Sequence, residues 1–152
     1  METVRIIVNP ASCGGRGRSI ADQASVEFLR LGLRHEIVFS RCTEDVSALT
    51  RLAVSEGRRL VVGIGGDGLL SEIANGLVGT TTALGIVPAG RGNDIARGLN
   101  IPLGVIDACR LIGANAVQTA ERARPVDAGN RRYQRIGAYR CIDGVARSLL
   151  CH

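Results

Sequence analysis

Runs of apolar and β-branched residues alternate along this chain of 152 residues with segments whose apolar positions recur three or four residues apart. The short continuous runs are typical of buried strands. They predict strands over residues 4–8, 36–39, 60–64 and 83–87. The periodic segments predict helices. These are expected over residues 19–31, from Thr43 to just before Gly57, over 71–77, over 95–99 as one short piece, and over 103–113.

Beyond residue 124, the pattern predicts two short strands over residues 125–127 and 132–136, joined by the turn Gly129-Asn130, and a final helix over 143–150. Strands that alternate with helices through short connections predict an α/β fold, a three-layer sandwich with helices on both faces of a mostly parallel sheet. The loops after the first, third and fourth strands then lie at one edge of the sheet. Ligands of open α/β sheets bind at that edge.

The strand at 60–64 is followed at once by a glycine-rich turn that contains one carboxylate. The turn consists of Gly65, Gly66, Asp67 and Gly68, and a helical segment follows it. Glycine lets a ligand approach the backbone closely, and the start of a helix offers unpaired N–H groups and a partial positive charge. The turn is therefore predicted to bind a phosphate group. Glycine-rich loops also follow the first strand, at 14–17, and the fourth, at 90–94.

Two common kinds of phosphate site do not match the sequence. The spacing of Gly63, Gly65 and Gly68 fits the dinucleotide fingerprint, which expects an acidic residue about 20 positions further on. No acidic residue occurs between Glu72 and Asp94, so a redox dinucleotide site is disfavoured. All 19 basic residues are arginines. This excludes a Walker-type P-loop and a Schiff-base enzyme, because both need a lysine.

Asp67 and Asp94 each lie in a glycine-rich turn at the end of a predicted strand. Both are expected to hold Mg²⁺, directly or through water, against the phosphates of a nucleotide, because this ion prefers carboxylate oxygens. Glu72 lies one helical turn beyond Asp67 and is placed to join them. The alternative is structural: the two aspartates cap helices, and Glu72 complements a helix dipole.

Composition places the chain among globular proteins. An apolar fraction of 45% with no apolar run of roughly 18 residues argues against a membrane span. The N-terminal residues lack the features of a signal peptide, which predicts a cytoplasmic protein. The five cysteines have no C-x-x-C spacing, and most are expected to be small buried residues. Neither His35 nor His152 is expected to be catalytic.

The formal net charge is +5, and the basic excess lies late in the chain. Such a cluster favours an anionic membrane surface or nucleic acid, although a solvated face explains it equally well. Because only 3% of the residues are aromatic, a base-stacking platform is not expected, and no nucleic-acid partner is predicted. The arginines concerned are Arg122, Arg124, Arg131, Arg132, Arg135, Arg140 and Arg147.

Several motifs together resemble the diacylglycerol kinase catalytic domain, which is shared with sphingosine kinases and bacterial lipid kinases. They occur in the family's order between residues 4 and 100, and the last of them is the most selective. The glycine–aspartate turn alone is also similar to that of NAD kinases and phosphofructokinases. The motifs are Ile7 to Ser12, Thr43-Glu44, Gly65 to Gly68 with Glu72, Asn75 to Leu77, and Pro88 to Arg97.

The resemblance implies an NAD kinase/diacylglycerol kinase-like nucleotide-binding domain over residues 1–125, followed over 126–152 by the start of a truncated β-rich domain. It implies ATP-dependent transfer of the γ-phosphoryl group to a lipid hydroxyl, such as that of diacylglycerol, with Mg²⁺ neutralising charge. The implied contacts with ATP come from Asn9, Pro10, Ala11, Ser12, Cys13, Thr43, Gly65, Gly66, Asp67, Gly68, Leu69, Leu70, Ser71, Glu72, Gly90, Arg91 and Asn93.

The implied partner is a lipid substrate at a membrane surface, reached by peripheral attachment to the inner membrane surface. Family members are longer, and their second domain supplies lipid binding and the general base. No residue here matches that base, so no catalytic residue is assigned, and either a homodimer or a separate chain with the missing domain is expected. The chain departs from the family at Cys13, Leu69 and Arg91, where the family has glycine, threonine and threonine. A non-catalytic nucleotide-binding or partner-binding module and an NAD kinase-like enzyme are the alternatives.

Overall fold

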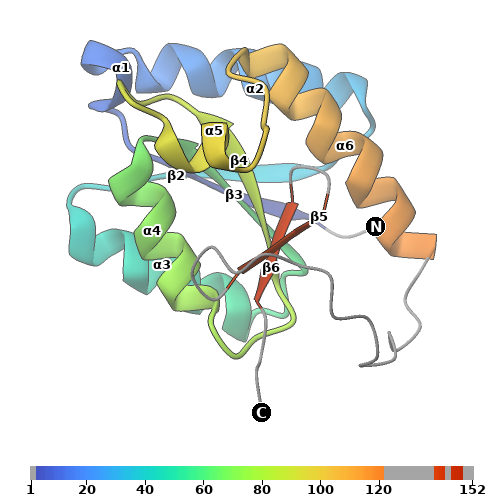
Figure 1. The fold of residues 1–152 in the computed structure, drawn as a ribbon. Helices are drawn as coiled ribbons and strands as arrows, with labels where there is room; N and C mark the ends of the chain where they lie inside the picture. Colours follow the sequence, from blue (N-terminus) through green and yellow to red (C-terminus); the bar gives the residue numbers. More distant parts are fainter. Residues whose placement is uncertain (1–2, 122–138, 143–144, 149–152) are drawn as a thin grey trace.

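A computed structural model of the chain describes residues 3–121, 139–142 and 145–148. Strands and helices alternate over most of its length, as the sequence pattern predicts (Figure 1). In chain order the elements are β1 (Val4–Val8), α1 (Ser12–Gly15), α2 (Gly17–Arg30), β2 (His35–Phe39), α3 (Thr43–Ser55), β3 (Leu60–Gly65), α4 (Asp67–Leu77), β4 (Ala83–Pro88), α5 (Asp94–Gly98), α6 (Val105–Glu121), β5 (Tyr139–Ile142) and β6 (Val145–Ser148).

These strands form one sheet in the order β2-β1-β3-β4-β6-β5. The first four are parallel to one another, so that Val8 of β1, for example, lies between Phe39 of β2 and Ile64 of β3. β6 pairs antiparallel with β4, and β5 pairs antiparallel with β6. The predicted mostly parallel sheet is therefore confirmed, and the carboxyl ends of β1, β2, β3 and β4 meet at one edge.

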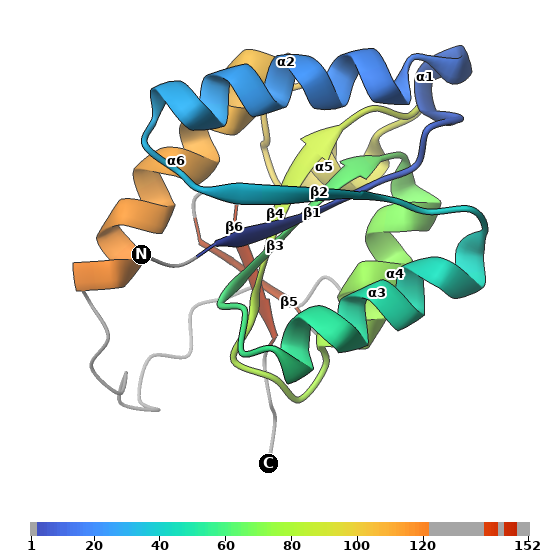
Figure 2. The same cartoon turned by 180° about the vertical axis from the view of Figure 1, so that it is seen from behind.

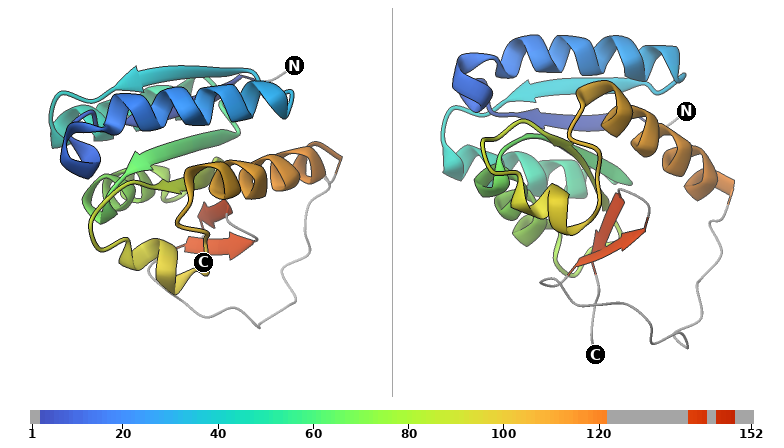
Figure 3. Two further views of the ribbon diagram at one scale, coloured as in Figure 1. Left: turned by 90° about the horizontal axis from the view of Figure 1, so that it is seen from above. Right: turned by 45° about the horizontal axis from the view of Figure 1, so that its top comes forward.

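Helices cover both faces of the sheet. α2 and α6 pack together on one face, and α3 and α4 pack together on the other (Figure 2). In the left view of Figure 3, α2 and α6 lie on the near side of the sheet, in front of the strands. The predicted three-layer sandwich is thus confirmed. Within the described ranges, no helix combines the length and the apolar character that a membrane crossing requires.

The core lies between these layers. Every residue of β1, β3 and β4 is buried, as expected for parallel strands that helices cover on both sides. This burial on both faces explains why the three strands are apolar along almost their whole length. The largest side chains with almost no exposed surface are Phe28, Ile6, Ile7, Ile64, Leu70, Ile73, Leu77, Ile86 and Ile112.

One charged residue, Arg5 of β1, is buried among the apolar strands. Its Nη2 lies 2.7 Å from a carboxylate oxygen of Glu56 and 3.0 Å from one of Glu36. Arg58 contacts the same two carboxylates. A charge in a protein interior needs a partner, and this ion network explains how a central strand accommodates an arginine.

The prediction that the third long helix begins at residue 71 is wrong, because α4 begins at Asp67. Gly66 has an extended backbone and occupies the N-cap position, so Asp67 and Gly68 already belong to the first helical turn. The glycines concealed this start, since glycine weakens a helical pattern. The carboxylate of the predicted phosphate turn is therefore part of a helix.

The helix predicted to end at residue 113 continues as α6 to Glu121. Gly113 lies inside it and is buried, and a Cβ atom at this position would lie 2.8 Å from Cδ1 of Leu31. The glycine therefore allows close contact between α6 and the end of α2 and does not terminate the helix.

The final helix predicted over residues 143–150 is also wrong, because residues 145–148 form β6. Beyond β4 the parallel sheet offers unpaired backbone groups, and β6 pairs with them. So short an apolar run cannot by itself distinguish a helix from a strand. The strands predicted over 125–127 and 132–136, with the turn Gly129-Asn130, lie outside the described residues, as does His152.

The cysteines and His35 differ in their burial and in their contacts. Of the three cysteines whose burial is described, Cys109 is buried, Cys13 is half-buried and Cys42, in the loop before α3, is exposed. Burial raises the pKa of the Cys109 thiol to about 12. The two ring nitrogens of His35 are hydrogen-bonded, one to the Ser25 hydroxyl at 2.7 Å and the other to a backbone carbonyl at 3.0 Å.

Candidate functional site

The glycine-rich loops after β1, β3 and β4 lie at the carboxyl edge of the sheet, as the sequence predicts. Backbone hydrogen bonds join them beyond the strand ends: Asn9 N–H donates to the Ile64 carbonyl at 3.3 Å, and Ala89 N–H donates to the Gly65 carbonyl at 2.9 Å. The parallel ladder thus continues into the loops and holds them in fixed register.

Gly66 and Gly90 bring two of these loops into direct backbone contact. A Cβ atom on Gly90 would lie 2.6 Å from the Cα of Gly66, and one on Gly66 would lie 3.3 Å from the Cα of Gly90. Any side chain at Gly90 would separate the loops. These two glycines are therefore required by packing between the loops, before any ligand is considered.

Asp67 links the same two loops through its side chain. Its Oδ2 accepts a hydrogen bond from the backbone N–H of Asp94, and its Oδ1 accepts one from the N–H of Ile95, each at 3.0 Å. These are donors in the first turn of α5, which lack partners inside their own helix. Asp67 therefore caps a helix, as the structural alternative proposed, although it caps α5 and not the helix to which it belongs.

Asp94 lies close to Asp67 and is exposed. A Cβ atom on Gly92 would lie 3.6 Å from Oδ2 of Asp94 and 3.7 Å from Oδ2 of Asp67, so both carboxylates flank the backbone at Gly92. Two carboxylates around one point are a suitable donor set for Mg²⁺, which prefers oxygen ligands and retains several waters. The residues present thus fit the predicted ion.

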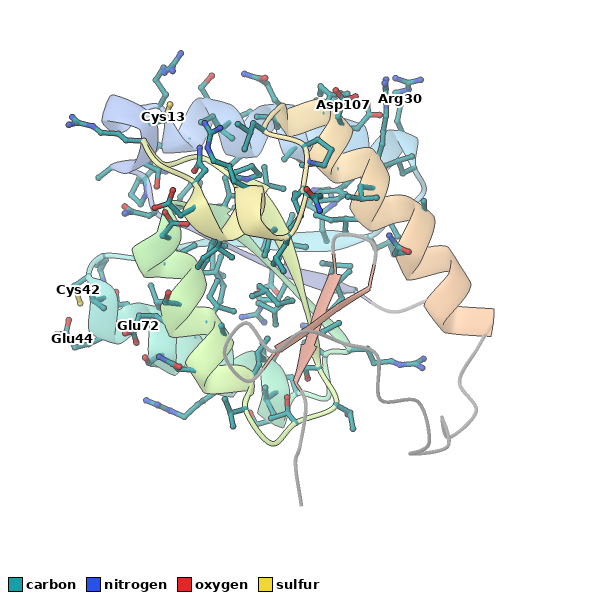
Figure 4. The ribbon with its side chains drawn as sticks, in the orientation of Figure 1. Cys13, Arg30, Cys42, Glu44, Glu72 and Asp107 are labelled. Atoms are coloured by element: carbon teal, nitrogen blue, oxygen red, sulfur yellow. The ribbon has the colours of Figure 1, made fainter. Side chains whose placement is uncertain are left out.

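Glu72 does not join this pair. Its Oε2 accepts a hydrogen bond from Ser47 Oγ of α3 at 2.9 Å, and Figure 4 shows Glu72 on the side of α4 that faces Cys42 and Glu44. Within the described residues, no group of three acidic, histidine or cysteine side chains is arranged to hold a metal ion. The structure therefore separates Glu72 from the two aspartates with which the sequence grouped it.

A pocket of about 370 Å³ opens between the loop after β1, the start of α3 and the start of α4. A Cβ atom on Gly68 would meet nothing within 4 Å. No side chain of the described residues caps the start of α4, which leaves its first N–H groups available to an anion. The pocket is lined by Asn9, Ser40, Arg41, Cys42, Thr43, Val46, Gly68, Leu69 and Glu72.

Arg41 lines this pocket, and the pKa values of Arg41 and of two acidic residues at the start of α3 are shifted in favour of their ionised forms. A hydrogen bond from the Arg41 side chain lowers the pKa of Asp45, and the same contact raises the pKa of Arg41. The pKa of Glu44 is lowered, chiefly by a hydrogen bond from its own backbone N–H and then by the Cys42 side chain. Arg41 and Glu44 are exposed and Asp45 is half-buried, so their contacts contribute little to stability.

The loop after β1 includes the short element α1, in which consecutive residues have a left-handed backbone. Cys13, Gly14 and Gly15 have φ angles of 54°, 69° and 90°. Arg16 donates from Nε to the Cys13 carbonyl at 3.3 Å and from Nη2 to its Sγ at 2.9 Å. Glycine adopts this conformation without strain, whereas cysteine does not. The departure from glycine at position 13 thus falls where the backbone has a left-handed conformation.

The loop after β4 is held by its own side chain, Asn93. Its Oδ1 accepts from Gly90 N–H at 2.8 Å, and its Nδ2 donates to the Gly90 carbonyl at 3.1 Å. Arg97 Nε donates to the Gly92 carbonyl at 2.9 Å. Arg91 is exposed at the tip, with no hydrogen bond or ion pair to the described part of the chain. It is therefore free to meet an anionic ligand.

Most of the predicted site residues lie in one of two places, the pocket or the contact between the loops after β3 and β4. Two of them, Leu69 and Leu70, are 7% and 0% exposed, so their side chains belong to the core and only their backbone could face a ligand. Ser12 is also buried, whereas Pro10 is half-buried and Ala11 and Ser71 are exposed. Those that line the pocket are Asn9, Thr43, Gly68, Leu69 and Glu72. Those at the contact between the second and third loops are Gly65, Gly66, Asp67, Gly90, Arg91, Asn93 and Asp94.

Sequence reasoning missed the loop after β2. Ser40, Arg41 and Cys42 line the pocket, but this loop contains no glycine that would mark it in the sequence. The parallel order held the necessary information, because β2 also ends at the same edge. Polar residues directly after any parallel strand are candidates of this kind.

Comparison with known proteins agrees with this geometry. The model of the family described as "Diacylglycerol kinase catalytic domain" matches residues 3–125. A diacylglycerol kinase of Bacillus subtilis (strain 168) is 31% identical over 131 residues, which are 85% of this chain and 42% of that protein. A probable lipid kinase YegS-like of Xanthomonas oryzae pv. oryzae (strain MAFF 311018) is 40% identical over 86 residues, 53% of this chain and 28% of that protein.

Among solved structures, the crystal structure of a diacylglycerol kinase from Bacillus anthracis str. Sterne has a TM-score of 0.67 at 26% identity, over 75% of this chain and 40% of that one. The solution structure of a phosphate-loop protein shares the fold alone, with a TM-score of 0.51 and 15% identity over 84% of this chain and all of that one. This chain thus spans less than half the length of the kinases that it resembles. With its family model matched over most of the sequence, the chain belongs to the diacylglycerol kinase catalytic domain family.

Proposed function

We propose that this chain is the nucleotide-binding half of an ATP-dependent lipid kinase, which transfers the γ-phosphoryl group of ATP to a lipid hydroxyl such as that of diacylglycerol. Membership of the family supports the kinase class. The observation that carries the proposal is the meeting of an uncapped helix start, two carboxylates and a pocket at the carboxyl edge of the sheet.

Each part of this edge has a role in the proposal. Mg-ATP, when bound, supplies the phosphoryl group and a divalent charge that neutralises the phosphates. Asp94 and Asp67 hold the ion, the backbone N–H groups at the start of α4 bind phosphate oxygens, and the pocket beside Thr43 receives the rest of the nucleotide. Arg91 neutralises phosphate charge in place of the lysine that the chain lacks.

The acceptor lipid and the general base are proposed to come from outside the described residues. The homologous kinases are more than twice as long as the matched part of this chain, so a further β-rich domain beyond the matched part fits this role. The lipid acceptor places the reaction at a membrane surface, which the protein would reach by peripheral attachment. No described residue is assigned as a base.

Titration calorimetry with ATP in the presence of Mg²⁺ tests the nucleotide site directly. A dissociation constant in the range of about 1 µM to 1 mM, typical of enzyme substrates, is expected. Thr43→Ala and Gly68→Val should weaken binding, because the first removes a hydroxyl at the pocket and the second places two methyl groups in its open space. Thr81→Ala is the matched control, since Thr81 is exposed at the opposite end of β4.

The kinase step is tested separately with vesicles of phosphatidylglycerol that contain diacylglycerol and with ATP labelled at the γ-phosphate. Labelled phosphatidic acid formed by the chain alone would assign the complete reaction to it. Binding of ATP without product is the result expected of a nucleotide-binding half. If ATP with Mg²⁺ does not bind, or if the Thr43 and Gly68 variants bind it as tightly as the Thr81 control, the proposed function is wrong.

A further inference from the structure

The carboxylate of Asp67 makes more hydrogen bonds to the protein than a role as metal ligand requires. Both of its oxygens accept backbone N–H groups, from Asp94 and from Ile95, at 3.0 Å each. The neighbouring carboxylate of Asp94 has no hydrogen bond or ion pair within the described part of the chain. Two aspartates that look equivalent in the sequence therefore differ in their surroundings.

The helix that Asp67 holds is short, and its other supports are the burial of Ala96 in the core and the hydrogen bond from Arg97 to the Gly92 carbonyl. α5 contains only five residues, from Asp94 to Gly98, and a helix of this length is not stable by itself. Its N-cap residue, Asn93, has a left-handed backbone and makes no side-chain cap hydrogen bond. Asp67 thus supplies the side-chain acceptors for the first donors of α5.

The loop before α5 is internally rigid, so its position follows that of α5. The Asn93 side chain closes the loop on Gly90, and Gly90 touches Gly66. Arg91 lies in this loop, and Asp94 is the first residue of α5. A change in the hold of Asp67 on α5 would therefore displace both the free carboxylate and the free guanidinium.

Resting on the function proposed above, we propose that Asp67 is a positioning residue: its carboxylate clamps α5 to α4 and thereby fixes Asp94 and Arg91 for the metal and the phosphates. This role and a role as metal ligand alone predict opposite effects of removing the Asp67 carboxylate on ATP binding when Mg²⁺ is absent. Without the metal, removal of a negative charge from a phosphate site strengthens ATP binding by relieving repulsion. Loss of the clamp weakens it, because Arg91 is no longer held in place.

The experiment compares Asp67→Ala, Asp67→Asn and the control Asp94→Asn in the full chain. Amide hydrogen exchange, followed by nuclear magnetic resonance and corrected for intrinsic rates, reports the clamp without any ligand. The protection of the Asp94 and Ile95 amides is expected to fall at least about tenfold in Asp67→Ala, as for loss of a hydrogen bond to a charged group. In Asp67→Asn the protection of these two amides should lie between that of the unsubstituted chain and that of Asp67→Ala, since the asparagine side chain keeps one acceptor oxygen. Asp94→Asn should leave the Ile95 amide unchanged.

Calorimetry with ATP, once with Mg²⁺ and once with a chelator, then separates the two roles. Asp67→Ala is expected to weaken ATP binding by roughly threefold to tenfold in both conditions, a change that corresponds to about 1 kcal/mol. Asp94→Asn should weaken it only with Mg²⁺. Thermal unfolding of Asp67→Asn, the milder variant, shows whether the fold is retained.

Two results would overturn the positioning role: unchanged protection of the Asp94 and Ile95 amides in Asp67→Ala, or metal-free ATP binding that stays equal or becomes tighter in that variant. If the unsubstituted chain binds no ATP in either condition, the proposed function fails instead. The amide exchange then still decides whether Asp67 holds α5.

Discussion

Gly76, in the motif Asn75 to Leu77, tests how closely α3 and α4 pack against each other, because the crossing of these helices explains why a glycine stands there. Gly76 lies inside α4 and Thr50 inside α3, and these two helices pack on the same face of the sheet. A Cβ atom on Gly76 would lie 2.8 Å from Cγ2 and 3.1 Å from Cβ of Thr50. We therefore expect Gly76→Ala to force the helices apart.

The magnitude follows from two opposing effects. Glycine to alanine inside a helix stabilises by about 1 kcal/mol through helix propensity. Overpacking of a well-packed core costs about 1–3 kcal/mol, and Thr50 is 0% exposed with its hydroxyl bonded to the Val46 carbonyl at 2.7 Å, so it has little freedom to move. The net change is a loss of up to about 2 kcal/mol in the free energy of unfolding.

Urea unfolding followed by circular dichroism measures this change, since the chain has no tryptophan for fluorescence. The matched control is Gly68→Ala in the same helix, where the new methyl group meets nothing within 4 Å. It should stabilise by about 0.5–1 kcal/mol. Thr50→Ser removes the methyl group nearest to the new Cβ, so in the Gly76→Ala background it should cost less than it does alone.

Equal stabilisation by Gly76→Ala and Gly68→Ala would refute this reasoning, because it would mean that α3 and α4 do not approach closely at Gly76. Additive effects of Thr50→Ser and Gly76→Ala would refute it as well. Thr50 and Gly76 would then contribute to stability independently, in contradiction to their contact.

Two other features give predictions of different kinds. Asn93→Ala should lower the free energy of unfolding by about 1–3 kcal/mol, since it removes two hydrogen bonds to Gly90 and leaves a left-handed alanine. In the same urea assay, Asn93→Gly should lower the free energy of unfolding by less. An equal loss in the two variants would show that backbone strain plays no part. In native protein at pH 8, a maleimide reagent should label exposed Cys42 and spare buried Cys109, as peptide mass spectrometry would reveal. Burial raises the pKa of Cys109 from 9.0 to about 12, so the unfolded chain loses this proton first as the pH rises. Stability should therefore decline between pH 9 and about 12, and less steeply in Cys109→Ala.

Much of the fold could be predicted because it depends on local pattern and on burial. The apolar runs of β1, β3 and β4, interrupted only by Arg5, required strands covered on both faces, and the helical segments between them supplied the cover. Where local pattern and tertiary packing disagreed, the prediction was wrong. Gly113 looked like a helix end but is a contact with Leu31, and residues 145–148 pair with β4 although their pattern was compatible with a helix.

The candidate site shows the same division. Parallel strands must end at a common edge, so the sequence alone brought the loops of Asp67 and Asp94 together. Sequence spacing could not tell that Asp67 is engaged by the amides of α5 while Asp94 is free, or that Glu72 turns toward Ser47. Those differences arise from hydrogen bonds between segments 25 to 28 residues apart. Periodicity and composition specify which residues are buried and where chains turn, whereas the partner of each polar group is chosen only when distant segments pack.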